Sequence, residues 1–354
     1  MEQNGKQQRS NSFKIGVTCG DYNSISYEVV VKALSHEMVC DFFTPVFYGS
    51  SNLLNNVAET LHVDMPAFSV MKNTFVNHHK INVVNLTSDN ASIEPGKCTE
   101  QSKQAALLST DEAIAAVKAH VTDAMVFLPF AGHAGREATG FLAEKLASDH
   151  AMRIYCNENL RITSLADCNI NKPTEAGANT PNLNVIISRL NYVLKNDFLL
   201  SNPKIAVLNY HKHDGNDRTS QYSDVDLAAI AAKSISDGIA VFGPYNSDFL
   251  FIEQYKTQFD AFFIVNDVPA GDVFGMLTVD GGVVYTSGLP FTVTEPYYDN
   301  MYEAAGKSTA SALPLLRAMY LAKDITSNRL ENYRLKKNAL TFIKLKEAKD
   351  ENNE

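Results

Sequence analysis

The chain has 354 residues, of which 45% are hydrophobic and 20% are charged, as is usual for a globular protein. This length exceeds what one simple core needs, so we expect two domains or one large α/β unit. A net charge of −9 argues against a nucleic-acid-binding surface. The sequence also lacks a run of apolar residues long enough for a transmembrane helix. A small molecule or a protein is therefore the expected partner.

The cysteines are scattered and include no Cys-x-x-Cys pair: Cys19, Cys40, Cys98, Cys156 and Cys168. Residues 1–12 are polar and lack the apolar core of a secretion signal, so we expect a short disordered leader. An odd number of cysteines without a signal predicts reduced thiols and a cytoplasmic protein. We expect each thiol to fill a small space in the core, and only Cys168 to be a candidate for more.

Strands and helices alternate along the first third of the chain. Residues 13–21, FKIGVTCGD, predict an apolar strand that ends in a Gly-Asp turn, and residues 22–34 predict the helix that follows. Two more strands are expected at 45–50 and 81–86, with a helix at 51–61. A repeated strand–turn–helix order favours a doubly wound, parallel sheet.

The same alternation continues to the end of the chain. Residues 103–119 predict a helix because apolar residues recur there at helical spacing. Further strands are expected at 123–129, 152–157, 160–166, 203–210, 259–267 and 281–290, and further helices at 139–147, 181–198, 228–238 and 311–325. Open α/β sheets bind ligands where their strands end. This rule directs attention to the polar clusters at 20–24, 211–218, 246–248 and 266–267.

A group of ionisable residues follows the strand expected at 203–210. It contains His211, His213, Asp214 and Asp217. Imidazole and carboxylate are suitable ligands for Zn, Ni or Mn. A solvated loop that merely ends the strand explains the same residues, so both interpretations stay open.

Two further acids, Asp248 and Asp267, each follow an apolar strand and are candidate oxygen ligands. Helix capping or a turn accounts for them equally well. The common nucleotide-binding and hydrolase motifs are absent, because no GxGxxG, GxxxxGK[ST] or GxSxG occurs. Residues 132–137, GHAGRE, offer two glycines and an arginine to a phosphate, or form a strand-to-helix turn.

Several segments in order resemble the 4-hydroxythreonine-4-phosphate dehydrogenase family of vitamin B6 biosynthesis, from about Lys14 to Ile325. The segments that carry the resemblance are KIGVTCGDYNSISYEVVVKAL, PGKCTEQSKQAA with DAMVFLPF, PKIAVLNYHKHDG, GPYNSDFLF, TSGLPF and AAGK. The fold of this family is similar to that of isocitrate and isopropylmalate dehydrogenases. The resemblance thus implies two α/β domains with a cleft between them.

The resemblance also sets the expected domain limits. The first domain would comprise 13–130 plus 290–330, and the second 131–289 with the dimer interface. Residues 331–354 are expected to form a helical, charged tail.

The resemblance implies a homodimer with a shared active site and a small phosphorylated substrate. Members of the family use NAD to oxidise the secondary alcohol of a phosphorylated hydroxy-amino acid, and decarboxylation follows. A divalent metal (Zn, Mg or Co) held by three histidines would act as a Lewis acid, while hydride transfer belongs to the cofactor. The acids of the family match Asp248 and Asp267, which are the expected catalytic residues.

The metal ligands implied by the resemblance are mostly replaced. The second histidine of the family falls on His213. The first falls on Cys168, or on Asn169 if a gap shifts the match, and the third falls on Asn266. A thiolate can bind a soft metal, but an asparagine is a poor ligand for one.

The substrate-binding signatures are replaced as well. The Gly-His-Thr-Glu signature reads Glu-Ala-Thr-Gly here, which leaves Thr139 as an expected substrate-binding residue. In place of the Arg-Thr-Ser run the chain has Val293, Thr294 and Glu295, which leaves Thr294 in that role. Loss of the arginine removes a bidentate partner for phosphate, and Glu295 is expected to add repulsion.

Two hypotheses follow for the function. The chain is either a divergent NAD-dependent oxidoreductase of this family with an altered or impaired metal and substrate site, or a non-catalytic or repurposed paralogue that binds a ligand or regulates. A fold alone does not decide between them, because function depends on the site.

Overall fold

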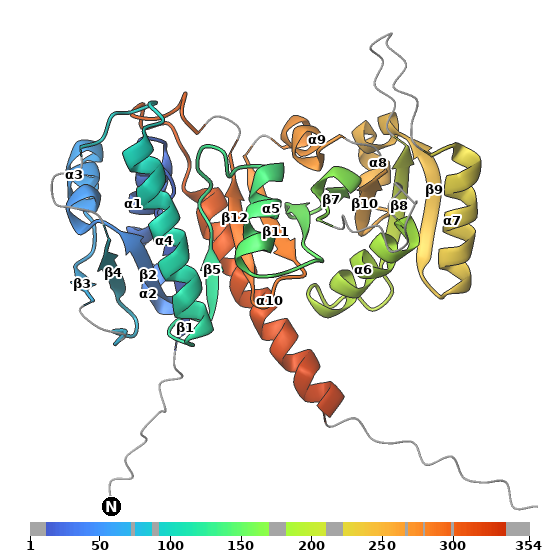
Figure 1. Ribbon diagram of the computed structural model, residues 1–354, viewed down its shortest axis with the longest axis horizontal. Coiled ribbons are helices and arrows are strands. Elements are labelled where there is room, and N and C mark those ends of the chain that lie inside the picture. The colour runs from blue at the N-terminus through green and yellow to red at the C-terminus, as the bar shows by residue number, and fades with distance from the viewer. Residues whose placement is uncertain are drawn as a thin grey trace, which may run out of the picture.

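One mixed β-sheet forms the centre of the molecule, and helices pack on both of its faces (Figure 1). The computed structural model describes the residues 12–71, 75–86, 92–169, 182–209, 222–265, 268–278, 280–298 and 301–337. Within these ranges the sheet has 12 strands in the order β3-β4-β2-β1-β5-β12-β11-β6-β7-β10-β8-β9. The α/β class predicted from the sequence is therefore confirmed.

Each strand and helix predicted up to Ile325 has a counterpart, and only the ends differ. The helical tail predicted at 331–354 is helical to Lys337, and its remaining residues lie outside the described residues. The strands are β1 (Phe13–Thr18), β2 (Phe43–Gly49), β3 (Phe68–Val70), β4 (Ile81–Asn85), β5 (Ala124–Val126), β6 (Met152–Cys156), β7 (Arg161–Ser164), β8 (Lys204–Asn209), β9 (Ala240–Asn246), β10 (Ala261–Ile264), β11 (Gly282–Ser287) and β12 (Val293–Tyr297). The helices are α1 (Ser26–Leu34), α2 (Val39–Phe42), α3 (Ser51–Leu61), α4 (Glu100–Lys118), α5 (Arg136–Lys145), α6 (Leu183–Asn196), α7 (Asp224–Ser236), α8 (Glu253–Lys256), α9 (Ala270–Leu277) and α10 (Leu313–Lys337), with 3-10 turns η1 (Leu165–Asp167) and η2 (Ser247–Phe251).

The first half of the sheet is parallel, as predicted. Strand β1 pairs with β2 on one side and β5 on the other, so that Ile15 lies beside both Pro45 and Ala124. Every residue of β2 is buried. This matches its apolar sequence, because a parallel strand has helices on both faces and exposes neither.

The centre of the sheet departs from the predicted parallel arrangement. Strand β11 is antiparallel to both β12 and β6, and β6 is antiparallel to β7. The connections at 288–292 and 157–160 are too short for a crossover, and so they join antiparallel neighbours. The sheet is thus mixed.

Strand β6 separates the two sides of the central sheet. Met152, Ile154 and Cys156 belong to the core beneath α6, whereas Tyr155 belongs to the core beneath α9. Because side chains alternate along a strand, Arg153 points to the same side as Tyr155. The two sides of β6 therefore carry different chemistry.

Helix α10 connects the two halves of the molecule. It contacts β5, β11, β12, α1 and α6, and it extends past the edge of the sheet (Figure 1). None of the described helices combines the length and the apolar run needed to cross a bilayer. The predicted domain limits remain a prediction, as does the disordered leader at 1–12, of which all residues but Ser12 lie outside the described residues.

Candidate active-site cleft

A cavity of about 440 Å³ opens between the loop after β5, the start of α9, and strands β6, β11 and β12. The described residues that line it are Pro129, Ala134, Gly135, Glu137, Arg153, Tyr155, Pro269, Gly271, Asp272, Val284, Glu295, Pro296, Tyr297, Tyr298 and Met301. They come from both halves of the sheet and include Glu295 of β12, the strand in which the resemblance places substrate contacts. We call this cavity the cleft.

The floor of the cleft holds a buried ion pair. Arg153 donates from Nη1 to Oε1 of Glu295 at 2.7 Å and from Nη2 to Oε2 at 2.9 Å. Side-chain exposure is 2% for the arginine and 0% for the glutamate. Burial acts to lower the pKa of Arg153, but the facing carboxylate outweighs this effect and raises it. Burial raises the pKa of Glu295, and the guanidinium opposes that rise, so that the two charges compensate each other.

This ion pair changes what was expected of Glu295. The glutamate was predicted to repel a phosphate, yet its charge is compensated by Arg153 and it is fully buried. The two exposed acids of the cleft, Glu137 and Asp272, have no cationic partner among the described lining residues. The negative character of the cleft thus comes from these two acids.

Sequence reasoning missed Arg153, although the sequence contains a signal for it. The residue stands within the apolar strand MRIYC, and an arginine in a buried strand requires a buried acidic partner. The partner lies 142 residues away. No local pattern connects the two.

A second polar network fixes the wall of the cleft around Asp167, which is 0% exposed. Its carboxylate accepts hydrogen bonds from Ser164 Oγ at 2.6 Å, from the backbone N–H of Ala270 at 2.7 Å and from the Tyr155 hydroxyl at 3.4 Å. Burial raises the pKa of Asp167, and these hydrogen bonds oppose that rise. The network ties the end of β7 to the first residue of α9, so it holds the cleft wall in place.

Three of the predicted site residues lie within the described residues but do not line the cleft. Thr294 is buried and donates its hydroxyl to the carbonyl of Ala318 in α10 at 2.8 Å. Thr139 is buried in α5, and its hydroxyl has no hydrogen-bond partner among the described residues. Asp248 is exposed in η2. Their catalytic and substrate-binding roles remain predictions.

The predicted metal ligands are not brought together within the described residues. Cys168 is buried in the core beneath α6, and its thiol contacts the Ser164 carbonyl oxygen at 3.3 Å. Burial raises the pKa of this thiol, which disfavours the thiolate that a metal would need. His213, Asn266 and the predicted catalytic acid Asp267 lie outside the described residues. Within those residues, no three His, Cys, Asp or Glu side chains are placed to hold a metal ion.

A second cavity lies beside the Gly-Asp turn after β1. It measures about 430 Å³, and its apolar walls include Tyr22, Tyr27, Leu53 and Ile93. Gly20 adopts φ +58°, and an added Cβ would lie 2.9 Å from the Cβ of Leu128. Only glycine therefore fits this turn. The cavity lies at the end of a parallel strand, where open α/β sheets bind ligands.

The carboxylate of Asp21 holds the Gly-Asp turn in place. It accepts hydrogen bonds from the Tyr302 hydroxyl at 2.8 Å, from Ser102 Oγ at 3.0 Å and from the backbone N–H of Asn23 at 2.8 Å. The turn is thereby connected to α4 and to the segment before α10. Its backbone is rigid beside the cavity.

The chain has relatives among known proteins. A model of the family described as "Pyridoxal phosphate biosynthetic protein PdxA" matches residues 41–322. The chain is 28% identical over 330 residues to the 4-hydroxythreonine-4-phosphate dehydrogenase of Bacteroides thetaiotaomicron, which covers 90% of each protein. It is 25% identical over 323 residues to the enzyme of the same name from Sulfurihydrogenibium sp., which covers 87% of this chain and 97% of that relative.

A solved structure supports the fold. The crystal structure of 4-hydroxythreonine-4-phosphate dehydrogenase from Klebsiella pneumoniae superposes with a TM-score of 0.65 at 21% identity, covering 89% of this chain and 100% of that one. The match of the family model includes β2 to β12 and all the described residues that line the cleft. The chain therefore belongs to the pyridoxal phosphate biosynthetic protein PdxA family.

Proposed function

We propose that the chain is a divergent, NAD-dependent oxidoreductase of the PdxA family whose metal and substrate sites are altered. Relatives named 4-hydroxythreonine-4-phosphate dehydrogenase support the oxidoreductase class. The residues that line the cleft support the proposal that the substrate site is altered. In this proposal the site descends from one that oxidises and then decarboxylates a phosphorylated hydroxy-amino acid. The substrate of the present chain differs from that of the family.

The observation that carries this proposal is the engagement of both Nη atoms of Arg153, which leaves only its buried Nε without a hydrogen-bond partner among the described residues. A phosphate is recognised by donors that are free to turn towards it, and an arginine offers two in parallel. Here both Nη atoms bind Glu295. Arg153 is the only Lys or Arg among the described lining residues, and Glu137 and Asp272 add negative charge. This lining favours a neutral or cationic hydroxylated substrate over a phosphorylated one.

As part of this proposal we assign NAD to the cavity beside the Gly-Asp turn. Tyr22, Tyr27 and Leu53 would hold a flat ring there, and Gly306 lies at the rim. When bound, NAD supplies the hydride acceptor, and the residues of the chain bind and orient it.

The predicted donors fit a divalent metal poorly. One imidazole (His213), one buried thiol with a raised pKa (Cys168) and one amide (Asn266) form a weak set for Zn, Mg or Co. This set supports impaired metal binding. We retain Asp248 and Asp267 as the proposed catalytic acids, and a homodimer with a shared active site as the proposed assembly.

The test is an NAD reduction assay with two substrates, 4-phosphohydroxy-L-threonine and 4-hydroxy-L-threonine, with the Bacteroides thetaiotaomicron relative assayed in parallel. We expect at least a 100-fold lower kcat/KM than the relative on the phosphorylated substrate, a preference for the substrate without phosphate, and less than one metal ion per chain by elemental analysis. A kcat/KM equal to that of the relative, with one bound metal ion per chain, would overturn the proposal.

The second candidate function is a non-catalytic or repurposed paralogue that binds a ligand or regulates. The observation that favours this second function is the weak set of metal donors, His213, Cys168 and Asn266. Thermal stabilisation by NAD without turnover of either substrate would support this candidate. Turnover of 4-hydroxy-L-threonine would exclude it.

A further inference from the structure

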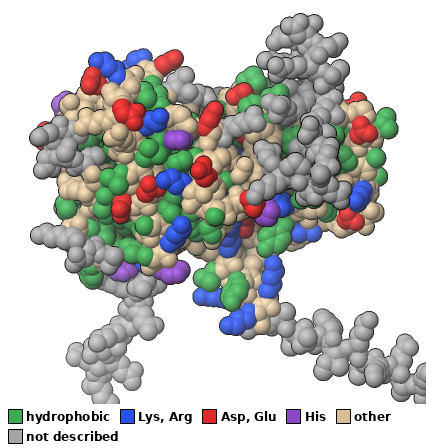
Figure 2. All heavy atoms as spheres, viewed as in Figure 1, with side chains coloured by type: hydrophobic (Ala, Val, Ile, Leu, Met, Phe, Trp, Pro, Cys, Tyr) green, Lys and Arg blue, Asp and Glu red, His purple; other side chains and the backbone are tan. Residues whose placement is uncertain are grey.

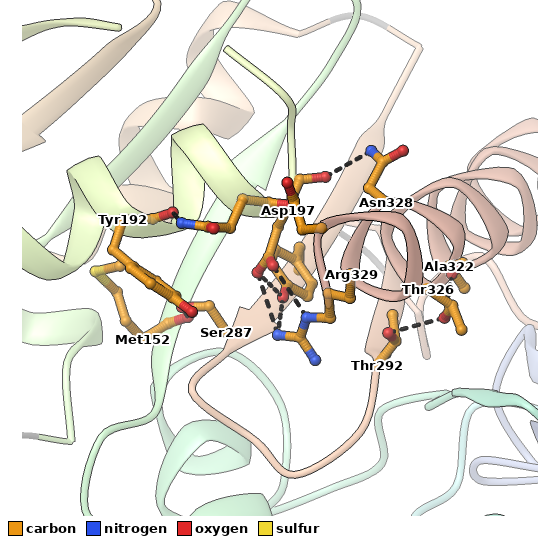
Figure 3. A network of polar contacts seen from close by, with 12 residues as sticks. Met152, Tyr192, Asp197, Ser287, Thr292, Ala322, Thr326, Asn328 and Arg329 are labelled. Atoms are coloured by element: carbon orange, nitrogen blue, oxygen red, sulfur yellow. Dashed lines mark hydrogen bonds and ion pairs between the residues drawn. The ribbon is translucent and has the colours of Figure 1, made fainter. Parts of the chain in front are cut away.

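A cavity of about 500 Å³ lies between α6, the end of α10 and the turn that joins β11 to β12. Figure 3 shows part of its surroundings, with Tyr192 from α6, Arg329 from α10, and Met152 and Ser287 from the sheet. We call it the α6–α10 cavity. Nothing in the proposed dehydrogenase chemistry uses it.

The α6–α10 cavity and the cleft lie on opposite faces of the sheet. On β6, Met152 lines the cavity while Arg153 lines the cleft. On β11, Ser287 lines the cavity, and Val284, an odd number of residues away, lines the cleft. Because alternate residues of a strand face opposite sides, the two sites are separated by the sheet itself.

The one acid among the described residues of the α6–α10 cavity is already neutralised. Asp197 accepts from Arg329 Nε at 3.0 Å and Nη2 at 3.1 Å, and from the Tyr285 hydroxyl at 2.5 Å. Its side chain is only 5% exposed. Arg329 and Asp197 therefore cancel, and they leave the charge of the other basic residues uncompensated.

Two cations of the cavity have no acidic partner among the described lining residues. The Nη1 atom of Arg189 is buried and has no hydrogen-bond partner among the described residues. Lys336 donates to the neutral side chain of Asn196 at 2.9 Å and lies 5.4 Å from the ring of Tyr192. Basic side chains gather over this end of α10 (Figure 2). The chain as a whole carries a charge of −9, so this positive cavity is a local feature.

We propose that the α6–α10 cavity binds a small organic oxyanion, a phosphate or a carboxylate. A guanidinium and an ammonium that lack an acidic partner attract an oxyanion, because the bonds between them are charge-assisted. Arg189 and Lys336 both line the cavity and supply these two positive charges, since the one acid of the described lining, Asp197, is paired with Arg329. Tyr192, Val193 and Leu289 provide apolar surface for the organic part of the ligand.

The test is isothermal titration of the full-length protein with phenyl phosphate and with benzoate at constant ionic strength in chloride buffer. Benzyl alcohol is the uncharged control ligand. We expect saturable binding of at least one of the two anions at one site per chain, and no binding of benzyl alcohol. The stronger of the two anions identifies the oxyanion as phosphate or carboxylate.

Variants then locate the site. Arg189→Gln should weaken binding at least 10-fold, and Lys336→Gln about 3-fold. Arg334→Gln, on the same helix but outside the lining, should leave binding unchanged. If Arg189→Gln does not fold, the anion affinities of Lys336→Gln and Arg334→Gln are compared instead, and Lys336→Gln becomes the deciding variant. Absence of binding by both anions, or equal binding by the wild type and the deciding variant, would overturn the proposal.

Discussion

The two faces of the central sheet each carry an arginine–carboxylate pair, and the pairs have opposite effects on their surroundings. In the cleft, Arg153 and Glu295 are both buried, and the remaining charged groups of the described lining are acids. In the α6–α10 cavity, Arg329 and Asp197 also cancel, but the remaining groups are cations. A buried arginine therefore does not by itself mark an anion site. The charges of the other lining residues decide, because each lining contains one arginine nitrogen without a hydrogen-bond partner among the described residues, Arg153 Nε and Arg189 Nη1.

The largest expected effect tests the pair in the cleft. Glu295→Leu leaves the Arg153 guanidinium buried without its counter-ion, which should destabilise the fold by about 3–5 kcal/mol. Urea denaturation measures the change. The double variant Arg153→Leu with Glu295→Leu should recover most of the loss, because no charge then stays buried. A single variant that loses less than about 1 kcal/mol would contradict the pairing.

The matching change on the other face should have a smaller effect. Arg329→Met removes the partner of Asp197, yet the Tyr285 hydroxyl still donates to that carboxylate and the arginine is 28% exposed. A loss of about 1–3 kcal/mol is expected in the same denaturation experiment. A loss of stability as large as that of Glu295→Leu would contradict the distinction between the fully buried pair in the cleft and the partly exposed pair in the α6–α10 cavity.

A pH series examines the network that holds the cleft wall. The raised pKa of Asp167 means that the folded protein holds this proton more tightly than the unfolded chain does. The group therefore stabilises the fold below its unfolded pKa, and this contribution is lost as the pH rises through the folded pKa. The isosteric Asp167→Asn variant does not titrate there. The stability of the wild type relative to this variant should rise as the pH falls from 7 to 4, and a constant difference would contradict the shift.

The smallest effect concerns Thr294. Thr294→Val removes the hydrogen bond to the Ala318 carbonyl and should cost about 0.5–1.5 kcal/mol. If Thr294 acts only through this contact with α10, the affinity for cleft ligands stays unchanged. A loss of affinity without a loss of stability would support its predicted role in substrate binding.

The sequence predicted the parallel half of the fold better than its centre. Apolar strands followed by amphipathic helices identified β1, β2 and β5, because each such unit is local in sequence. Strand β12 was missed because Pro296 interrupts a short run that does not read as a strand. Strand β12 pairs with β11 through the turn at 288–292, and the buried charge of Glu295 is compensated by Arg153, which is distant in the sequence.

The candidate site was less predictable for a related reason. A resemblance assigns roles position by position, whereas the chemistry of a position depends on contacts made through the fold. Glu295 was expected to be a repulsive charge until Arg153 was placed beside it. Conversely, nothing in the sequence near Arg189 indicates that one of its donors is buried without a partner.

One measurement tests the contrast between the two faces most directly: isothermal titration of the double variant Arg189→Gln with Lys336→Gln, which removes both unpaired cations of the α6–α10 cavity, with 4-phosphohydroxy-L-threonine in the presence of NAD. With the α6–α10 cavity disabled, the cleft is the remaining candidate for a phosphorylated ligand. The account predicts no saturable binding. Binding at one site per chain would show that the cleft accepts the phosphate, and would contradict the altered substrate site.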